Sequence, residues 1–359
     1  MKKILLISNR VMHYRVSVYN YFFRRFREYG FDFILRSNAL QKQNPHPLHF
    51  DFREIPFNFK KYREEIKSIN PDIVILFLHQ KDIIYWPLIH WLKFNKIPVV
   101  YWNKAINYDA PDNKIKRMLF HYLQTISDSI ILYAEQEIKY IGEKNRYKVH
   151  IAKNTINFED FPEIQESKEA IKEELGISFK KVVLSVGSMG IDGGRKKISH
   201  LVEIFNDIER SDIGLVIVGS GMNEALLKKR GENNIVYLGE IHDPRNIKIS
   251  KIFKMADLFS IPGHVGLALN QAFYWGLPVI TEEGSQPPEI NYLISGRNGF
   301  VVPHNDLAQL RQKILFLLDH EDIRQDFSRN AKEDILSNAS IENMFMGFKE
   351  CADSLLSAK

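Results

Sequence analysis

The sequence predicts an α/β chain built from two doubly wound domains, and three observations support this. Short apolar runs of strand length alternate with helical patterns along most of the 359 residues. That length is too great for one ordinary core and suits two domains. A polar, unpatterned stretch from Asn154 to Lys168 separates the two series and is typical of a linker. We therefore expect an N-terminal domain over 1–165, a second over 166–340, and a C-terminal helix over 341–359 that can pack back on the first domain.

The first half contains six predicted strands. They cover Ile4 to Ile7, Phe31 to Leu35, Ile73 to Phe77, Val99 to Trp102, Ile130 to Ala134, and Val149 to Ile151. Helical periodicity predicts helices from about Tyr14 to Tyr29, Phe59 to Ile69, Ile83 to Phe94, Lys114 to Ser127, and Glu135 to Glu143. Residues 37–58, which include Pro45 and Pro47, are expected to form a long loop or an irregular edge segment. This alternation is typical of a parallel sheet with helices on both faces.

The second half repeats the pattern after a helix that ends at Leu175-Gly176. Its predicted strands cover Lys181 to Val186, Ile213 to Val218, Ile235 to Leu238, Leu258 to Ile261, Pro278 to Thr281, and Gly299 to Val302. From Leu307 onward the pattern is helical and amphipathic. Two sequential doubly wound domains predict a cleft between the carboxyl ends of both sheets, where ligands of such folds bind.

Composition limits the class of protein. With 45% hydrophobic and 26% charged residues, the chain has a globular composition, and no run approaches the roughly 18 apolar residues of a membrane span. The apolar run at Ile4 to Ile7 is too short for the core of a signal peptide. The single cysteine, Cys351, excludes an intrachain disulfide or a cysteine metal site and indicates a reducing compartment. We expect a cytoplasmic protein.

Charge is spread unevenly along the chain. Residues 1–165 hold 26 Lys and Arg against 17 Asp and Glu, whereas the whole chain has a net charge of +5. The basic half is predicted to meet an anionic partner, either a membrane surface or a phosphate-bearing acceptor. Tyr19 to Arg27 and Ile83 to Lys96 mix aromatics with cations, which suits an anionic membrane surface or, alternatively, core aromatics beside a solvated basic face. No nucleic-acid motif accompanies these cations, so we expect no nucleic-acid partner.

The stretch from Asp257 to Thr281 is the most informative of the chain. It has the pattern of a strand, a glycine-rich turn, a helix, a tight turn and a second strand. Gly263 and Gly266 let the backbone approach a ligand closely, and the free N–H groups of a helix N-terminus suit a phosphate. Alternatively, the two glycines serve only a tight turn.

Other segments of the second domain place glycines or cations directly after predicted strands. They are Ser185 to Lys197, Val218 to Gly221, and Gln286 to Phe300. Because the carboxyl ends of parallel strands meet at one edge, these glycines and Arg195-Lys196-Lys197 are expected to gather at one rim. Such a rim can hold a diphosphate without a metal ion. The alternative for the basic triplet is a solvated charge run.

The ordered set of motifs leads to a family. It comprises Val-Gly-Ser-Met with Arg195-Lys196, Leu215 to Gly221, Val236 to Gly239, Phe253 to Asp257, Gly266-Leu267 with Gln271-Ala272, Gly276 to Val279, Pro288-Glu289, and Asn298 to Phe300. In this order the segments resemble the retaining glycosyltransferases of family 4, which have the GT-B fold and use nucleotide-sugar donors. The resemblance covers nearly the whole chain and is strongest from Lys181 to Pro303. It implies two Rossmann-like domains facing a cleft.

The resemblance implies roles for matching residues. Lys196, with Arg195 beside it, would neutralise the departing diphosphate, because cleavage of the anomeric bond leaves negative charge on a phosphate oxygen. Backbone N–H groups around Gly266 to Ala268 would hold the distal phosphate, and transfer would proceed with retention through front-face attack. The implied donor-binding residues are Gly187, Ser188, Gly219, Gly221, Tyr237, Gly263, Val265, Gly266, Leu267, Ala268, Gln271 and Glu283.

The sequence departs from the family pattern at one place. The usual motif has two glutamates eight positions apart around the glycine-rich turn, and these positions are Gly263 and Gln271 here. The amide oxygen of Gln271 can still accept hydrogen bonds from ribose hydroxyls. Gly263 offers no side chain, so the donor-sugar contact is expected from another residue, with His264 as the nearest catalytic candidate and Glu282 and Glu283 behind it.

Acceptor-side residues are expected in the first domain. His13-Tyr14-Arg15 resembles the loop-to-helix segment that family members place at the acceptor side. Asn103 and Lys104 follow a predicted strand at a rim position and are candidates for contact with sugar or phosphate. An exposed βα loop without a role is the alternative for these two residues.

The function predicted from the sequence is a retaining glycosyltransferase of the hexosyltransferase type. It would move a sugar from a nucleotide-diphosphate sugar to a glycan or lipid-linked acceptor in the biosynthesis of a polysaccharide such as lipopolysaccharide or capsule, in the cytoplasm at the inner face of the cell membrane. No Asp-x-Asp motif occurs, so we expect no metal and no other cofactor.

Two other functions remain open. A catalytically silent GT-B subunit that supports a partner enzyme is motivated by the missing glutamate. A sugar-nucleotide epimerase would need carboxylates for proton transfer, and Glu282, Glu283 and Glu289 are available. A nicotinamide dehydrogenase fits poorly, because Ser8-Asn9-Arg10 after the first strand lacks the glycine fingerprint.

Overall fold

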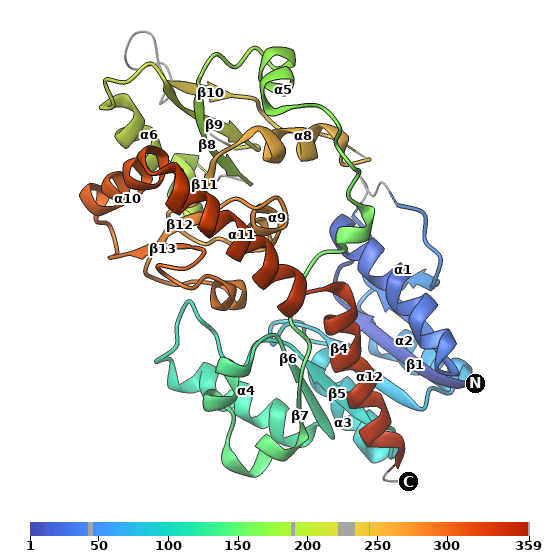
Figure 1. Cartoon of the computed structure of the whole chain (residues 1–359). Helices are drawn as coiled ribbons and strands as arrows, with labels where there is room; N and C mark the ends of the chain where they lie inside the picture. Colours follow the sequence, from blue (N-terminus) through green and yellow to red (C-terminus); the bar gives the residue numbers. More distant parts are fainter. Residues whose placement is uncertain (42–45, 188–190, 222–233, 244, 358–359) are drawn as a thin grey trace. The chain divides into compact units, whose positions relative to one another are not determined.

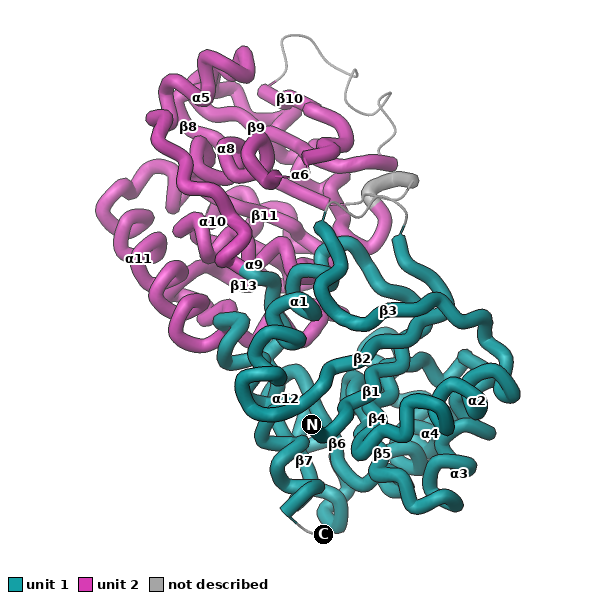
Figure 2. The backbone as a smooth tube through the Cα atoms, turned by 90° about the vertical axis from the view of Figure 1, so that its right-hand side faces the viewer, with its two compact units in different colours: residues 1–157, 340–359 teal, residues 158–339 magenta. Residues whose placement is uncertain are grey.

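The chain forms two compact units. In the computed structural model, unit 1 comprises residues 1–157 and 340–359, and unit 2 comprises residues 158–339 (Figure 2). The structure describes residues 1–41, 46–187, 191–221, 234–243 and 245–357. Each unit contains one parallel sheet with helices packed on it, so the predicted α/β class and the two doubly wound domains are confirmed (Figure 1).

The sheet of unit 1 has seven parallel strands in the order β3-β2-β1-β4-β5-β6-β7. They are β1 (Lys2–Ser8), β2 (Phe31–Ser37), β3 (Asp51–Glu54), β4 (Ile73–Phe77), β5 (Val99–Trp102), β6 (Ser129–Leu132) and β7 (Val149–Ile151). The strand order reverses between β1 and β4. Because connections on the two sides of such a reversal leave in opposite directions, the carboxyl ends of these strands border a crevice where this fold type binds ligands.

Helices cover both faces of this sheet. They are α1 (His13–Glu28), α2 (Phe59–Ile69), α3 (Tyr85–Phe94), α4 (Lys114–Ile126) and α12 (Ile341–Ser357). Side chains alternate along β1, so Ile4 and Leu6 join a core with α1 and α12, whereas Leu5 and Ile7 join a second core with α2, α3 and α4. The sheet is therefore buried on both sides, which accounts for its nearly continuous apolar strands.

The last helix completes the first of these cores. The rings of Phe22 on α1 and Phe348 on α12 lie 4.8 Å apart between centroids, and both side chains are fully buried. Glu342 of α12 accepts a 2.6 Å hydrogen bond from the hydroxyl of Tyr21. Tyr19, Phe22 and Phe26 are all core residues. Core packing, rather than contact with a membrane, thus accounts for the aromatics of the segment from Tyr19 to Arg27.

Two segments of unit 1 differ from the sequence prediction. The helix expected over Glu135 to Glu143 is two 3₁₀ helices, η1 (Glu135–Tyr140) and η2 (Glu143–Lys148). Regular α-helix is interrupted because Ile141 between them is extended and buried in the core. Within residues 37–58, the edge segment forms the short regular strand β3, paired in parallel with β2.

Unit 2 has six parallel strands in the order β10-β9-β8-β11-β12-β13. They are β8 (Lys181–Val186), β9 (Ile213–Val218), β10 (Ile235–Tyr237), β11 (Leu258–Ser260), β12 (Val279–Glu282) and β13 (Gly299–Val302). The helices and 3₁₀ turns are η3 (Phe158–Asp160), α5 (Lys168–Glu174), η4 (Ile191–Lys196), α6 (Ile198–Asn206), α8 (Ile247–Met255), α9 (Ala268–Tyr274), η5 (Pro288–Tyr292), α10 (Leu307–Asp319) and α11 (Glu321–Asn338). The order reverses between β8 and β11, so the loops that follow these two strands border the ligand-binding crevice of this unit. None of the helices in the described ranges of the chain has both the length and the apolar character needed to cross a bilayer.

Candidate functional site

The loops after β8 and β11 are joined by their backbones. The N–H of Gly263 donates to the carbonyl of Lys196 at 2.9 Å, and the N–H of His264 donates to that of Arg195 at the same distance. These bonds fix the basic segment against the glycine-rich turn at the reversal point of the sheet. The structure therefore brings together Arg195, Lys196, Gly263 and His264, as the sequence analysis expected.

Lys196 lies in the interior of this loop pair. Its Nζ donates to the carbonyl of His264 at 3.3 Å, and its chain packs so closely on Gly187 that a Cβ at that position would lie 2.4 Å from Lys196 Cε. Burial lowers the pKa of Lys196 to about 8. An anion placed beside this ammonium would restore part of the lost solvation, so the site favours a negatively charged ligand. Arg195 is exposed at the rim.

The structure explains why position 263 is glycine. A Cβ there would lie 2.0 Å from the carbonyl oxygen of Arg195, far inside any van der Waals contact. The basic loop thus occupies the space that a side chain at 263 would need. Glycine at position 263, where the family pattern has glutamate, therefore allows the two loops to pack closely.

Gln286 holds the glycine-rich turn from the other side. Its amide oxygen accepts from the N–H of Val265 at 3.1 Å, and its amide nitrogen donates to the carbonyl of Gly263 at 2.8 Å and to Thr281 Oγ1 at 3.0 Å. Sequence reasoning placed Gln286 in a rim segment but gave it no role. The only available signal was its position just after a strand end, in a segment with two prolines.

The start of α9 follows this turn. Gly266 has φ +60, and the N–H of Leu269 donates to its carbonyl at 3.1 Å. Because the N–H groups of Gly263, His264 and Val265 are engaged within the protein, phosphate contacts in the turn would fall to Gly266, Leu267 and Ala268. Gln271 is partly buried one turn farther along.

The third residue of the basic triplet serves a different partner. Lys197 Nζ lies 2.8 Å from the carboxylate of Glu282, which is fully buried and also bonded to His200 Nδ1 at 2.6 Å and to the N–H of Asn305 at 2.9 Å. Burial by itself raises the pKa of Glu282, but the hydrogen bonds from Lys197 and His200 outweigh burial and lower the pKa below its ordinary value. The triplet is therefore divided between the rim and a buried ion pair. Glu283, in contrast, is exposed.

The loops after β9 and β10 place the remaining glycines. The N–H of Gly219 donates to the carbonyl of Gly239 at 2.8 Å, and the hydroxyl of Tyr237 donates to the carbonyl of Gly219 at 2.7 Å. Gly187 donates to the carbonyl of Val218 at 2.9 Å, which links this group to Lys196. Tyr237 thus braces the loop through its hydroxyl. Gly221 has φ +88, and Ser188 lies outside the described residues.

The acceptor-side candidates of unit 1 fall into two groups. At the start of α1, both the backbone N–H and Nδ1 of the exposed His13 contact Gln41 Oε1, at 3.1 and 2.9 Å. Arg15 is buried, donates to Asn154 Oδ1 at 2.6 Å, and lies 5.6 Å from the ring centroid of Tyr14. These contacts hold Arg15 within unit 1, and its acceptor-side role stays a prediction.

The second group follows β5. Asn103 donates to the carbonyl of Leu78 at 3.0 Å, and Lys104 Nζ lies 5.5 Å above the ring of Tyr108. Both side chains are partly buried. Their loop is ordered by its own contacts, so it is more than an unstructured exposed turn.

The part of the chain that the structure describes contains no group of three or more His, Cys, Asp or Glu side chains placed to hold a metal ion. Whether the reaction needs a metal stays a prediction.

Comparison with known proteins bears on unit 2 first. Residues 167–334 match the family described as glycosyl transferases group 1. Among curated relatives, the D-rhamnosyltransferase WbpZ of Pseudomonas aeruginosa is 25% identical over 264 residues. The match covers 69% of this chain and spans 66% of that relative, just under two thirds of its length.

Solved structures extend the likeness to both units. The Anabaena protein Alr3699/HepE, solved in complex with UDP, has a TM-score of 0.79 at 13% identity, with 99% of this chain and 100% of that chain covered. WaaG, a glycosyltransferase involved in lipopolysaccharide biosynthesis, has a TM-score of 0.66 at 16% identity, with 97% and 98% covered. The chain thus has the GT-B fold, as predicted.

Proposed function

We propose that the chain transfers a sugar from a nucleoside-diphosphate sugar to a glycan or lipid-linked acceptor in polysaccharide biosynthesis, with retention of configuration and without a metal ion. The donor would lie in unit 2 at the reversal point of the sheet. There, Lys196 would neutralise the diphosphate as the anomeric bond breaks, and His264 would face the departing sugar. His13, Tyr14, Asn103 and Lys104 are the proposed acceptor-side residues.

The observation that carries this proposal is the setting of Lys196. A partly buried ammonium with a lowered pKa is held by two loops at the point where doubly wound sheets bind ligands. In an epimerase, carboxylates would have to line the reaction site. Glu282 is bonded to Lys197 and His200, Glu283 is exposed, and Glu289 is buried in η5. The geometry around Lys196 therefore favours departure of a diphosphate over proton transfer by a carboxylate.

A thermal-shift screen against UDP, GDP, ADP and CMP tests the proposal. Ligand at 100 times its Kd stabilises the folded protein by about 2.7 kcal/mol. We expect one diphosphate to raise the Tm of the wild type but not of Lys196→Ala. Lys180→Ala is the matched control, because Lys180 is exposed just before β8, at the opposite edge of the sheet. No shift with any nucleotide would support the silent-subunit alternative, and a shift retained in Lys196→Ala would refute the role of Lys196.

A membrane contact is proposed for unit 1. Ile83 and Phe94, at the two ends of the α3 segment, are 86% and 87% exposed, and Ile115, Met118 and Tyr122 of α4 are also exposed. The two helices are adjacent, since Tyr122 Oη lies 3.1 Å from His90 Nε2. Exposed Lys96 and Lys114 flank this apolar surface. Exposed apolar side chains flanked by cations suit the headgroup region of an anionic bilayer.

Co-sedimentation with vesicles tests this contact. We expect binding to phosphatidylglycerol vesicles, weaker binding to phosphatidylcholine vesicles, and release by salt. The double variant Ile83→Ser and Phe94→Ser should sediment less than wild type. Equal sedimentation of wild type and variant would remove the membrane part of the proposal.

A further inference from the structure

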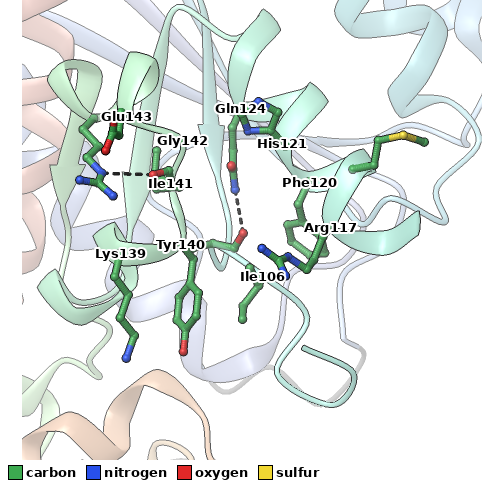
Figure 3. Close-up of a pocket in the computed structure, with 13 residues that line it drawn as sticks. Ile106, Arg117, Phe120, His121, Gln124, Lys139, Tyr140, Ile141, Gly142 and Glu143 are labelled. Atoms are coloured by element: carbon green, nitrogen blue, oxygen red, sulfur yellow. Dashed lines mark hydrogen bonds between the residues drawn. The ribbon is translucent and has the colours of Figure 1, made fainter. Parts of the chain in front are cut away.

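Unit 1 contains a cavity at the side of α4 that the donor chemistry does not use. Its volume is about 410 Å³, which lies within the range of small-molecule sites. The walls come from the loop after β5, from α4, and from η1 and η2 after β6. Figure 3 shows Arg117 on the α4 side and Lys139 with Tyr140 on the η1 side.

Two buried polar side chains, Gln124 and Glu137, fix one wall of this cavity. Ala105, in the wall, donates its N–H to Glu137 Oε1 at 3.0 Å and accepts at its carbonyl from Gln124 Nε2 at 2.8 Å. Gln124 and Glu137 are each 1% exposed. Glu137 also accepts from the hydroxyl of Tyr108 at 2.8 Å. The wall is therefore pre-organised before any ligand arrives.

The charges around the cavity are mainly positive. Arg117, Lys139 and Arg146 line it, whereas Glu143 is the one carboxylate among the lining residues. Within the described residues, none of these three cations forms an ion pair with a carboxylate. The nitrogen Nε of Arg146 donates to the carbonyl of Ile141 at 3.2 Å, which leaves its terminal nitrogens for other acceptors. Guanidinium groups bind phosphate oxygens in a planar, bidentate geometry.

An aromatic wall stands beside these cations. Tyr140 is half-exposed, and Lys139 Nζ lies 5.0 Å from its ring centroid. The ring also contacts that of Tyr108 at 6.4 Å, and Tyr108 lies under Lys104. The cavity is thus connected by direct contacts to the loop that carries the acceptor-side candidates Asn103 and Lys104. An aromatic ring with a polar tip offers contact area to a ring-shaped ligand and a hydroxyl for hydrogen bonding.

We propose that this cavity binds the phosphate group of a phosphorylated saccharide, with lining cations drawing the phosphate and Tyr140 against the sugar. The assignment rests on the proposed function, in which unit 1 receives the acceptor, and it specifies an acceptor that carries a phosphate. Glucose 1-phosphate is a suitable probe because it combines both groups in one small molecule.

Isothermal titration of the full chain at low ionic strength tests the assignment, with UDP present in excess to fill unit 2. We expect glucose 1-phosphate to bind more tightly than inorganic phosphate, and glucose to bind most weakly. Arg117→Gln and Arg146→Gln should each weaken binding of glucose 1-phosphate roughly tenfold, because each removes one positive charge from the lining. Lys144→Gln is the matched control, since Lys144 is exposed in the same 3₁₀ helix as Arg146 and does not line the cavity.

Three results would overturn the assignment. They are no binding of glucose 1-phosphate by the wild type, equal losses in Lys144→Gln and the arginine variants, and equal affinity for inorganic phosphate and glucose 1-phosphate. The UDP-induced rise in Tm, measured on the same samples, reports both folding of each variant and the donor site. A failure confined to glucose 1-phosphate is therefore distinguishable from a failure of the proposed function.

Discussion

Protonation of Lys196 should be coupled to donor binding. Burial lowers the pKa of this side chain to about 8 in the free protein, so near pH 8 about half of the molecules carry a neutral amine. A diphosphate beside Nζ favours the ammonium form and raises the pKa. Binding of UDP must then draw a proton from the buffer.

The size of this effect follows from the pKa. About half a proton should be taken up per UDP at pH 8, and almost a whole proton at pH 9. If only the charged form binds, the Kd for UDP should be roughly tenfold higher at pH 9 than at pH 7. Below pH 7 the wild type is already protonated, and proton uptake by Lys196 should vanish.

Calorimetry in two buffers of different ionisation enthalpy measures the uptake directly. We expect the apparent binding enthalpy at pH 8 and pH 9 to differ between HEPES and Tris for the wild type. Lys196→Arg is the matched control, because a guanidinium stays charged throughout this range. It should bind UDP without proton uptake and with a Kd that is flat to pH 9.

One calorimetric result would refute this role of Lys196. A wild-type enthalpy that is the same in both buffers at pH 8 and 9, together with strong UDP binding, would mean that Lys196 does not titrate near the diphosphate. The proton would then have no part in recognition, and another cation would have to neutralise the leaving group.

Four further predictions concern the same fold. Lys196→Met should stabilise the ligand-free protein by about 2 kcal/mol at pH 7. The fall of the Lys196 pKa from 10.5 to about 8 implies roughly 3 kcal/mol, and the expected value is smaller because the side chain is only partly buried. Urea unfolding should show that the advantage of the variant shrinks between pH 8 and 10.5, as Lys196 of the wild type loses its charge. Gly263→Ala should lower stability by about 3 kcal/mol and abolish the UDP-induced rise in Tm, since its methyl group would overlap the Arg195 carbonyl; unchanged unfolding would contradict the loop contact. Glu282→Gln should lower the free energy of unfolding by about 3 kcal/mol at pH 7. Because the pKa of Glu282 is depressed in the folded protein, unfolding measured at pH 7 and below 4.5 should show the wild-type advantage disappearing at the lower pH. Sugar transfer or donor hydrolysis should be unchanged by EDTA, and activity lost in EDTA and regained with Mn²⁺ would contradict the metal-free mechanism.

Strand positions were the most predictable part of the fold. In β1 and β8, continuous apolar runs of strand length reflect burial on both faces, which one sequence shows directly. The 3₁₀ helices after β6 were not predictable, because Ile141 is fixed by the core and Glu137 by partners from a different loop. Helical periodicity over nine residues contains neither fact.

Local motifs also predicted which loops meet at the site, but not which partner each side chain contacts. The sequence shows the glycine at 263. The reason for it is the carbonyl of Arg195, 68 residues earlier in the chain, which leaves no room for a side chain. Lys196 and Lys197 are adjacent and chemically alike, and only the fold places one between the loops after β8 and β11 and the other on the buried Glu282. The contacts of Gln286 likewise depend on two backbone segments, the turn from Gly263 to Val265 and the end of β12 at Glu282, which approach each other only after folding.

The position of α12 in unit 1 has a consequence for synthesis on the ribosome. Residues 1–157 emerge first, but the face of their sheet that Phe345 and Phe348 cover stays bare until the rest of the chain is made. At ordinary rates of translation, the intervening residues 158–339 take roughly 10 to 40 s to appear. All of unit 2 has then been synthesised while unit 1 still lacks α12. The nascent chain should therefore bind strongly to chaperones that recognise exposed apolar surface.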